Sequence, residues 1–220
     1  MNKNLSIITT SDGSQTIKRI DIDEHYHSVN GALQESLHVF IDNGFRYISK
    51  DEISIFEVGF GTGLNAMLSF VEAEKLNKTV DYTTIELYPI DKEIFTQFRY
   101  AEMLNIDSNK YFLPLHNAKW SESIELNKGF TFTKLNVDLL EYNPNKQFDI
   151  IYFDAFSPDK QSELWTKTVF GKMFAMLNAG GVLVTYSSKG EVKRNLRDSG
   201  FSVKRLPGAV GKRHILKAQK

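Results

Sequence analysis

A glycine-rich turn follows an apolar segment near the middle of the first half of the sequence. In the run Glu57-Val-Gly59-Phe-Gly61-Thr-Gly63, three glycines alternate directly after residues 53–58, which read as a strand. Glycines let a strand turn sharply into a helix, and they let a ligand approach the backbone without a Cβ in the way. The sequence therefore predicts a ligand-binding turn lined by these three glycines.

Two classes of nucleotide cofactor fit this turn. Gly61-Thr-Gly63-Leu-Asn-Ala66 also satisfies the dinucleotide fingerprint G-x-G-x-x-A, so the glycines alone do not separate a nicotinamide dinucleotide from S-adenosylmethionine. Glu57 favours S-adenosylmethionine, because an acid two residues before the first glycine can hold the ammonium group of that ligand. A nicotinamide-dependent oxidoreductase remains an alternative, although no hydride-transfer apparatus is evident in the sequence.

Three acids end the strands that follow the turn. Glu86 comes 25 residues after Gly61, where an acid can accept hydrogen bonds from ribose hydroxyls. Asp138 can accept a hydrogen bond from an adenine amino group, and Asp154 follows the apolar strand 148–153. Ligands of parallel sheets bind at the carboxyl ends of the strands, so we expect the three acids to meet at the glycine turn. A solvated or structural acid is the alternative at each position.

Asp154 is the candidate catalytic residue. Methyl transfer from a sulfonium is an in-line displacement, which depends on positioning and on an unprotonated nucleophile. Asp154 can align an amine substrate by accepting its N–H, or it can receive the proton of the amine. Because an ordinary aspartate has a pKa of about 3.9 and is a poor base, orientation is the expected role. The same residue is expected to border the cofactor.

Aromatic residues near the same edge of the predicted sheet can contact a flat substrate. Phe156, Trp165 and Tyr186 are expected on or near its loops, where their rings can stack on a nucleic-acid base. Packing in the apolar core is the alternative for each ring.

The end of the chain is basic. Residues 189–220 carry ten Lys and Arg against two acids, whereas residues 1–188 carry 17 Lys and Arg against 25 acids. Such a segment can bind a polyanion, although a solvated, charge-balanced surface explains it equally well. Arg194, Lys212 and Arg213 are the expected contacts to a nucleic-acid substrate.

The elements that position these residues alternate between strand and helix. Residues 5–20 read as a hairpin that turns at Asp12-Gly13, and residues 33–41 read as a helix. Residues 110–128 are ambiguous, with Trp120 as their expected anchor. Alternating units predict an α/β fold with a mostly parallel, doubly wound sheet. The expected strands are 53–58, 80–86, 132–137, 148–153, 182–186, 201–206 and 214–218, and the expected helices are about 64–76, 91–104 and 162–177, with a short basic helix after 186.

Composition fits an ordinary globular domain. Of 220 residues, 41% are hydrophobic and 25% are charged, and the absence of cysteine excludes disulfides, thiolate metal sites and a cysteine nucleophile. His25 and His27 have a spacing used for metals, but no third ligand is apparent and no metal site is expected. No run resembles a signal peptide or a membrane span, so a cytoplasmic protein without membrane contact is expected.

With these residues in view, the chain resembles the methyltransferase domain of the MnmC family, in its stand-alone form called MnmD. The resemblance spans about residues 26–216 and includes Tyr26-His-Ser-Val-Asn-Gly31. It rests mainly on Phe56-Glu-Val-Gly-Phe-Gly-Thr-Gly-Leu-Asn65 and Phe153-Asp-Ala-Phe-Ser-Pro158. It implies a Rossmann-like class I methyltransferase fold, with an antiparallel C-terminal strand. Residues 1–50 are expected to form a hairpin-and-helix cap on a domain of residues 51–220.

The resemblance also implies a reaction. Enzymes of this family methylate the aminomethyl group on the wobble uridine of certain tRNAs, which completes 5-methylaminomethyl-2-thiouridine. By position, Glu57, Gly59, Gly61 and Gly63 would line the methyl-donor site, with Glu86 at the ribose, Asp138 near adenine and Asp154 as the active-site aspartate. Because the sequence ends at Lys220, no flavin-binding domain is expected. A methyltransferase acting on a small-molecule or protein amine, and a non-catalytic RNA-binding protein, remain alternatives.

Overall fold

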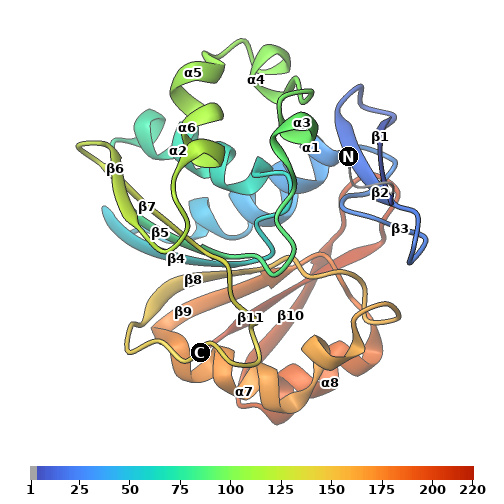
Figure 1. The fold of residues 1–220 in the computed structure, drawn as a ribbon. Helices are drawn as coiled ribbons and strands as arrows, with labels where there is room; N and C mark the ends of the chain where they lie inside the picture. Colours follow the sequence, from blue (N-terminus) through green and yellow to red (C-terminus); the bar gives the residue numbers. More distant parts are fainter. Residues whose placement is uncertain (1–3) are drawn as a thin grey trace.

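The computed structural model describes residues 4–220, whose strands form one sheet of three and one of eight (Figure 1). The large sheet has the order β10-β11-β9-β8-β4-β5-β7-β6, and β9, β8, β4, β5 and β7 run parallel in it. β11 lies antiparallel between β9 and β10, which confirms the predicted antiparallel C-terminal strand. The strands are β4 Glu52–Val58, β5 Thr79–Ile85, β6 Ser123–Asn127, β7 Phe130–Leu135, β8 Phe148–Phe153, β9 Leu177–Thr185, β10 Ser202–Pro207 and β11 His214–Gln219.

Helices cover both faces of the large sheet (Figure 1). Every residue of the central strand β8 is buried, as expected of a strand that is covered on both sides. One face carries α1 Ala32–Ser36, a π-helical continuation Leu37–Asp42, α2 Leu64–Leu76, α3 Lys92–Phe95, α4 Tyr100–Met103, α5 Ser108–Tyr111 and α6 Leu113–Asn117. The other face carries α7 Lys167–Met176 and α8 Gly190–Asp198.

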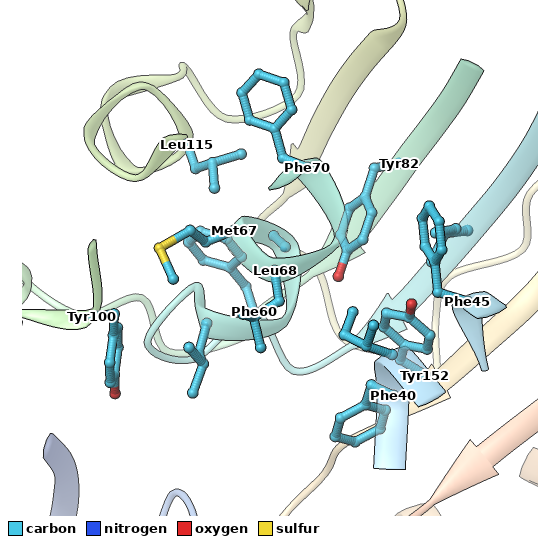
Figure 2. Packing of buried hydrophobic residues seen from close by; sticks show 14 of the residues in the cluster. Phe40, Phe45, Phe60, Met67, Leu68, Phe70, Tyr82, Tyr100, Leu115 and Tyr152 are labelled. Atoms are coloured by element: carbon cyan, nitrogen blue, oxygen red, sulfur yellow. The ribbon is translucent and has the colours of Figure 1, made fainter. Parts of the chain in front are cut away.

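The apolar core is divided by the sheet into two clusters. Figure 2 shows part of the first cluster, where the ring of Phe40 lies beside that of Tyr152 and Met67 of α2 lies toward Leu115. Because alternate residues of a strand point to opposite faces, Ile53 and Ile55 of β4 belong to this cluster while Phe56 and Val58 belong to the second. The same alternation decides where the polar residues of β4 lie.

The N-terminal hairpin is as predicted. β1 Leu5–Thr9 pairs antiparallel with β2 Gln15–Arg19, and the short β3 Glu24–His25 extends this second sheet. Ala32 and Phe40, from the segment that follows, lie in the same core cluster as α2. The predicted division of the chain at residue 50 stays a prediction.

Three predicted elements have different boundaries. The helix expected over 91–104 is divided into α3 and α4, and between them the N–H of Arg99 donates to Gln15 Oε1 (2.9 Å), so contact with the hairpin replaces a helical bond. The helix expected over 162–177 starts as a 3₁₀ turn, Ser162–Trp165, and α7 begins after the capping residue Thr166. The strand expected over 182–186 is β9, which starts earlier, at Leu177. Leu177 pairs with Phe148 of β8, and residues 178–181 form a bulge before the pairing resumes at Val182.

The ambiguous region 110–128 holds parts of two short helices and the edge strand β6, and Trp120 packs against the first core cluster as expected. Among the helices of residues 4–220, none combines the length and the apolar character that crossing a bilayer requires.

An ion pair between an exposed arginine and a buried glutamate joins the 3₁₀ turn Phe45–Tyr47 to α2. Arg46 donates from Nε to Glu72 Oε1 (2.6 Å) and from Nη2 to Oε2 (2.9 Å), and the Glu72 side chain is only 7% exposed. We predict that Arg46→Met lowers the free energy of unfolding by about 1–2 kcal/mol, because it leaves a buried carboxylate without its partner. Urea unfolding followed by circular dichroism measures the change.

Arg99→Met is the matched control. Its partner Glu102 lies 3.7 Å away, and both side chains are more than 70% exposed. Arg99→Met should therefore lower the free energy of unfolding by less than about 0.5 kcal/mol. Equal losses in the two variants would contradict the role given to the Arg46–Glu72 pair.

Candidate active site

A cavity of about 470 Å³ opens where strands β4, β5, β7 and β8 end. Five residues of the predicted cofactor site line it together: Gly59, Gly61, Glu86, Asp138 and Asp154. Residues of the N-terminal hairpin and of the loop after it line the cavity too. The structure thus brings the glycine turn and the strand-end acids to one place, as the sequence predicts for a parallel sheet.

The glycine turn connects β4 to α2 with three residues at positive φ. Gly59, Gly61 and Gly63 have φ of 90°, 50° and 75°, a region that favours glycine. A Cβ on Gly59 would lie 2.7 Å from the carbonyl oxygen of Asp154, and one on Gly61 would lie 3.1 Å from the ring of Tyr26. Gly63 is buried behind the turn and does not line the cavity; a Cβ there would lie 2.8 Å from His116 Nε2.

Glu86 follows β5 and is tied to the glycine turn. Its Oε2 accepts a hydrogen bond from the N–H of Gly61 (3.0 Å), and its Oε1 accepts one from the N–H of Tyr88 (2.9 Å). Burial raises the pKa of Glu86 above its ordinary value, while these N–H donors act in the opposite direction. The carboxyl group is half-buried in the cavity wall, where it can still accept hydrogen bonds from a ligand.

Asp154 follows β8 and is half-buried in the opposite wall. Its Oδ2 accepts a hydrogen bond from Asn65 Nδ2 (2.8 Å). Burial and, second to it, the negative charge of Glu35 raise the pKa of Asp154 to about 7, although Asn65 and Lys212 act in the opposite direction. A carboxylate with a pKa near 7 can accept a proton at neutral pH, so acceptance of the amine proton stands beside the expected orienting role of Asp154.

Glu57 lies beneath the cavity and not at its surface. Its side chain is 0% exposed, and it is absent from the residues that line the cavity. It occupies the β4 position after Ile53 and Ile55, so it points toward α2. Burial raises the pKa of Glu57 to about 8, with polar side chains of Thr84, Asn65 and Tyr82 nearby. The expected contact between Glu57 and the ammonium of a cofactor stays a prediction.

Asp138 lines the cavity from a turn that lies beyond the end of β7. The strand ends at Leu135, three residues earlier than Asp138. Asp138 Oδ1 accepts a hydrogen bond from the N–H of Leu140 (2.8 Å), which stabilises the turn. The residue lies at the predicted edge of the sheet, although it does not end the strand as the sequence suggested.

The three aromatic candidates differ in position. Phe156 and Tyr186 line the cavity, and the Tyr186 hydroxyl donates to the carbonyl of Ala155 (2.9 Å). Trp165 is only 3% exposed, packs against Phe153, and donates its indole N–H to the carbonyl of Phe156 (2.8 Å). Its ring has no face free for a substrate, which corrects the stacking role expected of it.

The basic candidates also separate. Lys212 lines the cavity, forms an ion pair with the buried Glu35, and has its ammonium 4.2 Å from the ring centroid of Tyr186. Arg194 and Arg213 are exposed outside the cavity. Of the three, Lys212 alone is positioned to act on the chemistry around Asp154.

Residues of the N-terminal segment complete the cavity wall. The guanidinium carbon of Arg19 lies 5.6 Å from the ring centroid of Phe156, whose ring meets Tyr26 edge to face at 5.0 Å. Glu24 Oε2 accepts a hydrogen bond from the hydroxyl of Ser157 (2.7 Å). Sequence reasoning assigned no site role to Arg19, Glu24 or Asn65. The runs 26–31 and 56–65, which carry the family resemblance, were the available signal for Tyr26 and Asn65.

One histidine of the pair His25 and His27 is engaged within the protein. His27 Nδ1 lies 2.9 Å from the hydroxyl of Thr16, and burial lowers the pKa of His27 to about 4. Across residues 4–220, no group of three or more His, Asp or Glu side chains is arranged to hold a metal ion.

The chain is similar to the tRNA 5-methylaminomethyl-2-thiouridine biosynthesis bifunctional protein MnmC of Idiomarina loihiensis. The two are 30% identical over 98% of this chain and 38% of that protein. MnmC of Burkholderia multivorans is also 30% identical, over 87% of this chain and 31% of that protein. The chain thus spans about a third of the length of these curated relatives, which confirms a resemblance to the methyltransferase part of MnmC.

Solved structures agree. A crystal structure of MNMC2 from Aquifex aeolicus covers 97% of this chain and 69% of its own, with a TM-score of 0.80 and 26% identity. Spermidine synthase from Thermotoga maritima covers 98% of this chain and 68% of its own, with a TM-score of 0.59, and at 11% identity this likeness shows the fold alone. The predicted Rossmann-like class I fold is confirmed. A family model described as S-adenosyl-L-methionine-dependent methyltransferase matches residues 100–220, which is more than half of the chain, and the chain therefore belongs to this family.

Proposed function

We propose that the chain transfers a methyl group from S-adenosylmethionine to the aminomethyl group of the wobble uridine in tRNA, giving 5-methylaminomethyl-2-thiouridine. The observation that carries this proposal is the position of Asp154, a carboxylate with a pKa near 7 beside the glycine turn. The MnmC relative that aligns with 98% of the chain supports the choice of substrate.

The cavity suits the cofactor. Its volume of about 470 Å³ falls within the roughly 300–1,000 Å³ typical of small-molecule and cofactor sites. Gly59 and Gly61 would leave backbone free for close approach, Glu86 would accept hydrogen bonds from the ribose, and Asp138 would lie near adenine. Glu57 and Gly63 would support the site from behind. When bound, S-adenosylmethionine supplies an electrophilic methyl group, and the proposed step needs neither flavin nor metal.

Asp154 would prepare the amine for attack. A primary alkylamine is largely an ammonium ion at neutral pH, and its nitrogen has no free lone pair until a proton leaves. Ionised Asp154 would accept that proton and, through the remaining N–H, orient the amine toward the methyl group. Asn65 and Lys212 favour the ionised form of Asp154, so they support its action as a proton acceptor.

A tRNA substrate fits other features of the surface. A wobble base lies in a single-stranded loop and can be splayed into a pocket at small cost. Phe156 and Tyr186 would contact the base inside the cavity, and Arg194 and Arg213 would meet phosphates outside it. Such a substrate would place the enzyme in the cytoplasm.

A cationic small molecule is the second candidate substrate. Besides Glu86, Asp138 and Asp154, the cavity is lined by Glu24, Glu35 and Glu163. Carboxylates attract cationic amines, so this lining also suits a free polyamine or another small amine.

Methyl transfer from labelled S-adenosylmethionine tests the proposal. With tRNA that lacks only the terminal methyl group, we expect label on the wobble nucleoside. Asp154→Asn should lower kcat about a hundredfold or more, because the proton acceptor is lost. The control Asp159→Asn should stay near wild type, since Asp159 is exposed and pairs with Lys189 outside the cavity. Label on a polyamine and none on tRNA would select the second candidate.

The pH dependence provides a separate test. Asp154 acts in its ionised form, so kcat/KM should rise with pH through a midpoint near 7, well above the ordinary range of an aspartate. Lys212→Met removes a positive charge that lowers the pKa of Asp154, so the midpoint should move to higher pH. The same tRNA is used for both enzymes, so the ionisation of the substrate amine affects both pH profiles equally. An unmoved midpoint in Lys212→Met would argue against Asp154 as the titrating group.

Glu86 is tested through cofactor affinity. Glu86→Gln should raise the Kd for S-adenosylhomocysteine about tenfold, because a charged acceptor of ribose hydroxyls becomes neutral. Isothermal titration calorimetry measures this without any methyl acceptor. Glu141→Gln is the matched control, since Glu141 is exposed and does not line the cavity. If both variants bound as wild type does, the ribose contact would be wrong.

A further inference from the structure

Three basic side chains gather where α8 packs against the edge strand β10. Lys193 and Arg197 are four residues apart on α8 and so lie on the same side of the helix. Val192 and Leu196 are buried and fix α8 to the sheet. Arg205 of β10 is exposed next to them. We name Lys193, Arg197 and Arg205 the α8–β10 strip.

The charges of the strip are not compensated within the protein. Across residues 4–220, no ion pair or side-chain hydrogen bond involves the charged group of any of the three residues. By contrast, Lys189 and Lys212 pair with acids. Repulsion from Arg197 lowers the pKa of Lys193, with further lowering by burial and by repulsion from Arg205, so the like charges are close enough to interact. A cluster that repels itself gains stability from an anionic partner.

Acids on the same helix lie apart from the strip. Glu191 and Asp198 are seven residues apart, two helical turns, and therefore share a different side of α8. Neither forms an ion pair with a residue of the strip in the described part of the chain. The charge of the strip thus faces solvent, while residues 1–188 carry 17 basic against 25 acidic residues and disfavour a polyanion elsewhere.

The strip leads toward the cavity. Pro207 ends β10 opposite His214, and the N–H of Gly208 donates to the carbonyl of Arg213 (3.1 Å). At about 3.3 Å per residue of strand, Gly208 lies about 10 Å along the chain from Arg205. Arg213 is exposed at this turn, and its neighbour Lys212 lines the cavity. Basic groups therefore extend from α8, along β10, to the site of Asp154.

We propose that the α8–β10 strip binds the sugar-phosphate backbone of tRNA while the target nucleotide occupies the cavity. The inference rests on the proposed function. Cations on α8 and β10, separate from those at the cavity, suit a substrate that carries a series of phosphates and not a single one. Phosphate contacts position such a substrate without reading its sequence, so the cavity and not the strip would select the base.

Measurements of tRNA affinity over a range of salt concentrations test whether the strip binds phosphates. The variant is Lys193→Gln/Arg197→Gln/Arg205→Gln, and the control is Lys75→Gln/Lys92→Gln/Lys128→Gln. The control residues are exposed, without an ion pair in residues 4–220, and remote in the fold on α2, α3 and the β6–β7 turn. Both variants lose three positive charges. Fluorescence anisotropy with labelled tRNA gives Kd, and calorimetry with S-adenosylhomocysteine checks the cofactor site.

The strip variant should bind tRNA at least tenfold more weakly near 0.1 M salt. The plot of the logarithm of the association constant against the logarithm of the salt concentration should become less steep, by about 2 in slope. The reason is that roughly 0.7–0.9 counterions are released per phosphate contact and the variant loses three such contacts. The control should keep the wild-type slope, and both variants should keep the wild-type affinity for S-adenosylhomocysteine.

Two results would overturn the inference while the proposed function stands. One is wild-type methylation of tRNA with an unchanged Kd and salt slope in the strip variant. The other is an unchanged slope together with self-association of the variant, which would show that the charges only protect the edge strand from pairing. If the wild type methylated no tRNA, the proposed function itself would fail.

Discussion

Three backbone hydrogen bonds at the carboxyl ends of β4, β5 and β8 hold the site together. The N–H groups of Gly59 and Phe60 both donate to the carbonyl of Ile85 (3.0 and 3.1 Å), and the N–H of Asp154 donates to the carbonyl of Val58 (3.0 Å). They fix the glycine turn against the residue before Glu86 and against Asp154 itself. These bonds join backbone N–H and C=O groups, so they do not depend on particular side chains, provided that the residues of the turn are small enough for the strands to approach. The chemistry then depends on which side chains follow.

The side chains that follow place several acids in a small, poorly solvated region. Burial raises the pKa of Glu57, Glu86 and Asp154 alike, but the surroundings of each differ. Glu86 is held by backbone N–H groups and Asp154 by Asn65 with Lys212 nearby, whereas Glu57 has no hydrogen-bond partner of good geometry in the described residues. With a pKa of about 8, Glu57 is largely neutral at pH 7. Mutual repulsion with the ionised Asp154 is thereby reduced.

Much of this arrangement could be predicted from local sequence. The alternation of strand and helix predicts the parallel sheet. The glycine turn and the acids at strand ends predict that Gly59, Gly61, Glu86 and Asp154 line the site. Both patterns can be recognised locally because they depend on neighbouring residues. The burial of Glu57 was also open to prediction, since Ile53 and Ile55 mark its side of β4 as covered. Treating Glu57 only as part of the glycine motif missed this burial.

The remaining features depend on contacts between distant segments. Arg19 and Tyr26 reach the cavity because the N-terminal hairpin lies over it, and no local pattern in residues 15–29 shows this. The break between α3 and α4 accompanies a bond to Gln15 of the same hairpin. The sequence around Trp165 does not show whether its ring packs in the core or stacks on a substrate. The pKa of Asp154 likewise follows from burial and from Glu35, which only the folded chain brings near.

The contact between Gly59 and Asp154 has a consequence for how this enzyme can change. No side chain fits at position 59 without moving the carbonyl of Asp154, which lies where a Cβ would be placed. A substitution meant to alter the cofactor turn would therefore also shift the reacting carboxylate, and substrate turnover would change together with cofactor affinity. The two halves of the site would therefore change together, and a change of substrate that spares the cofactor turn would have to come from other residues that line the cavity.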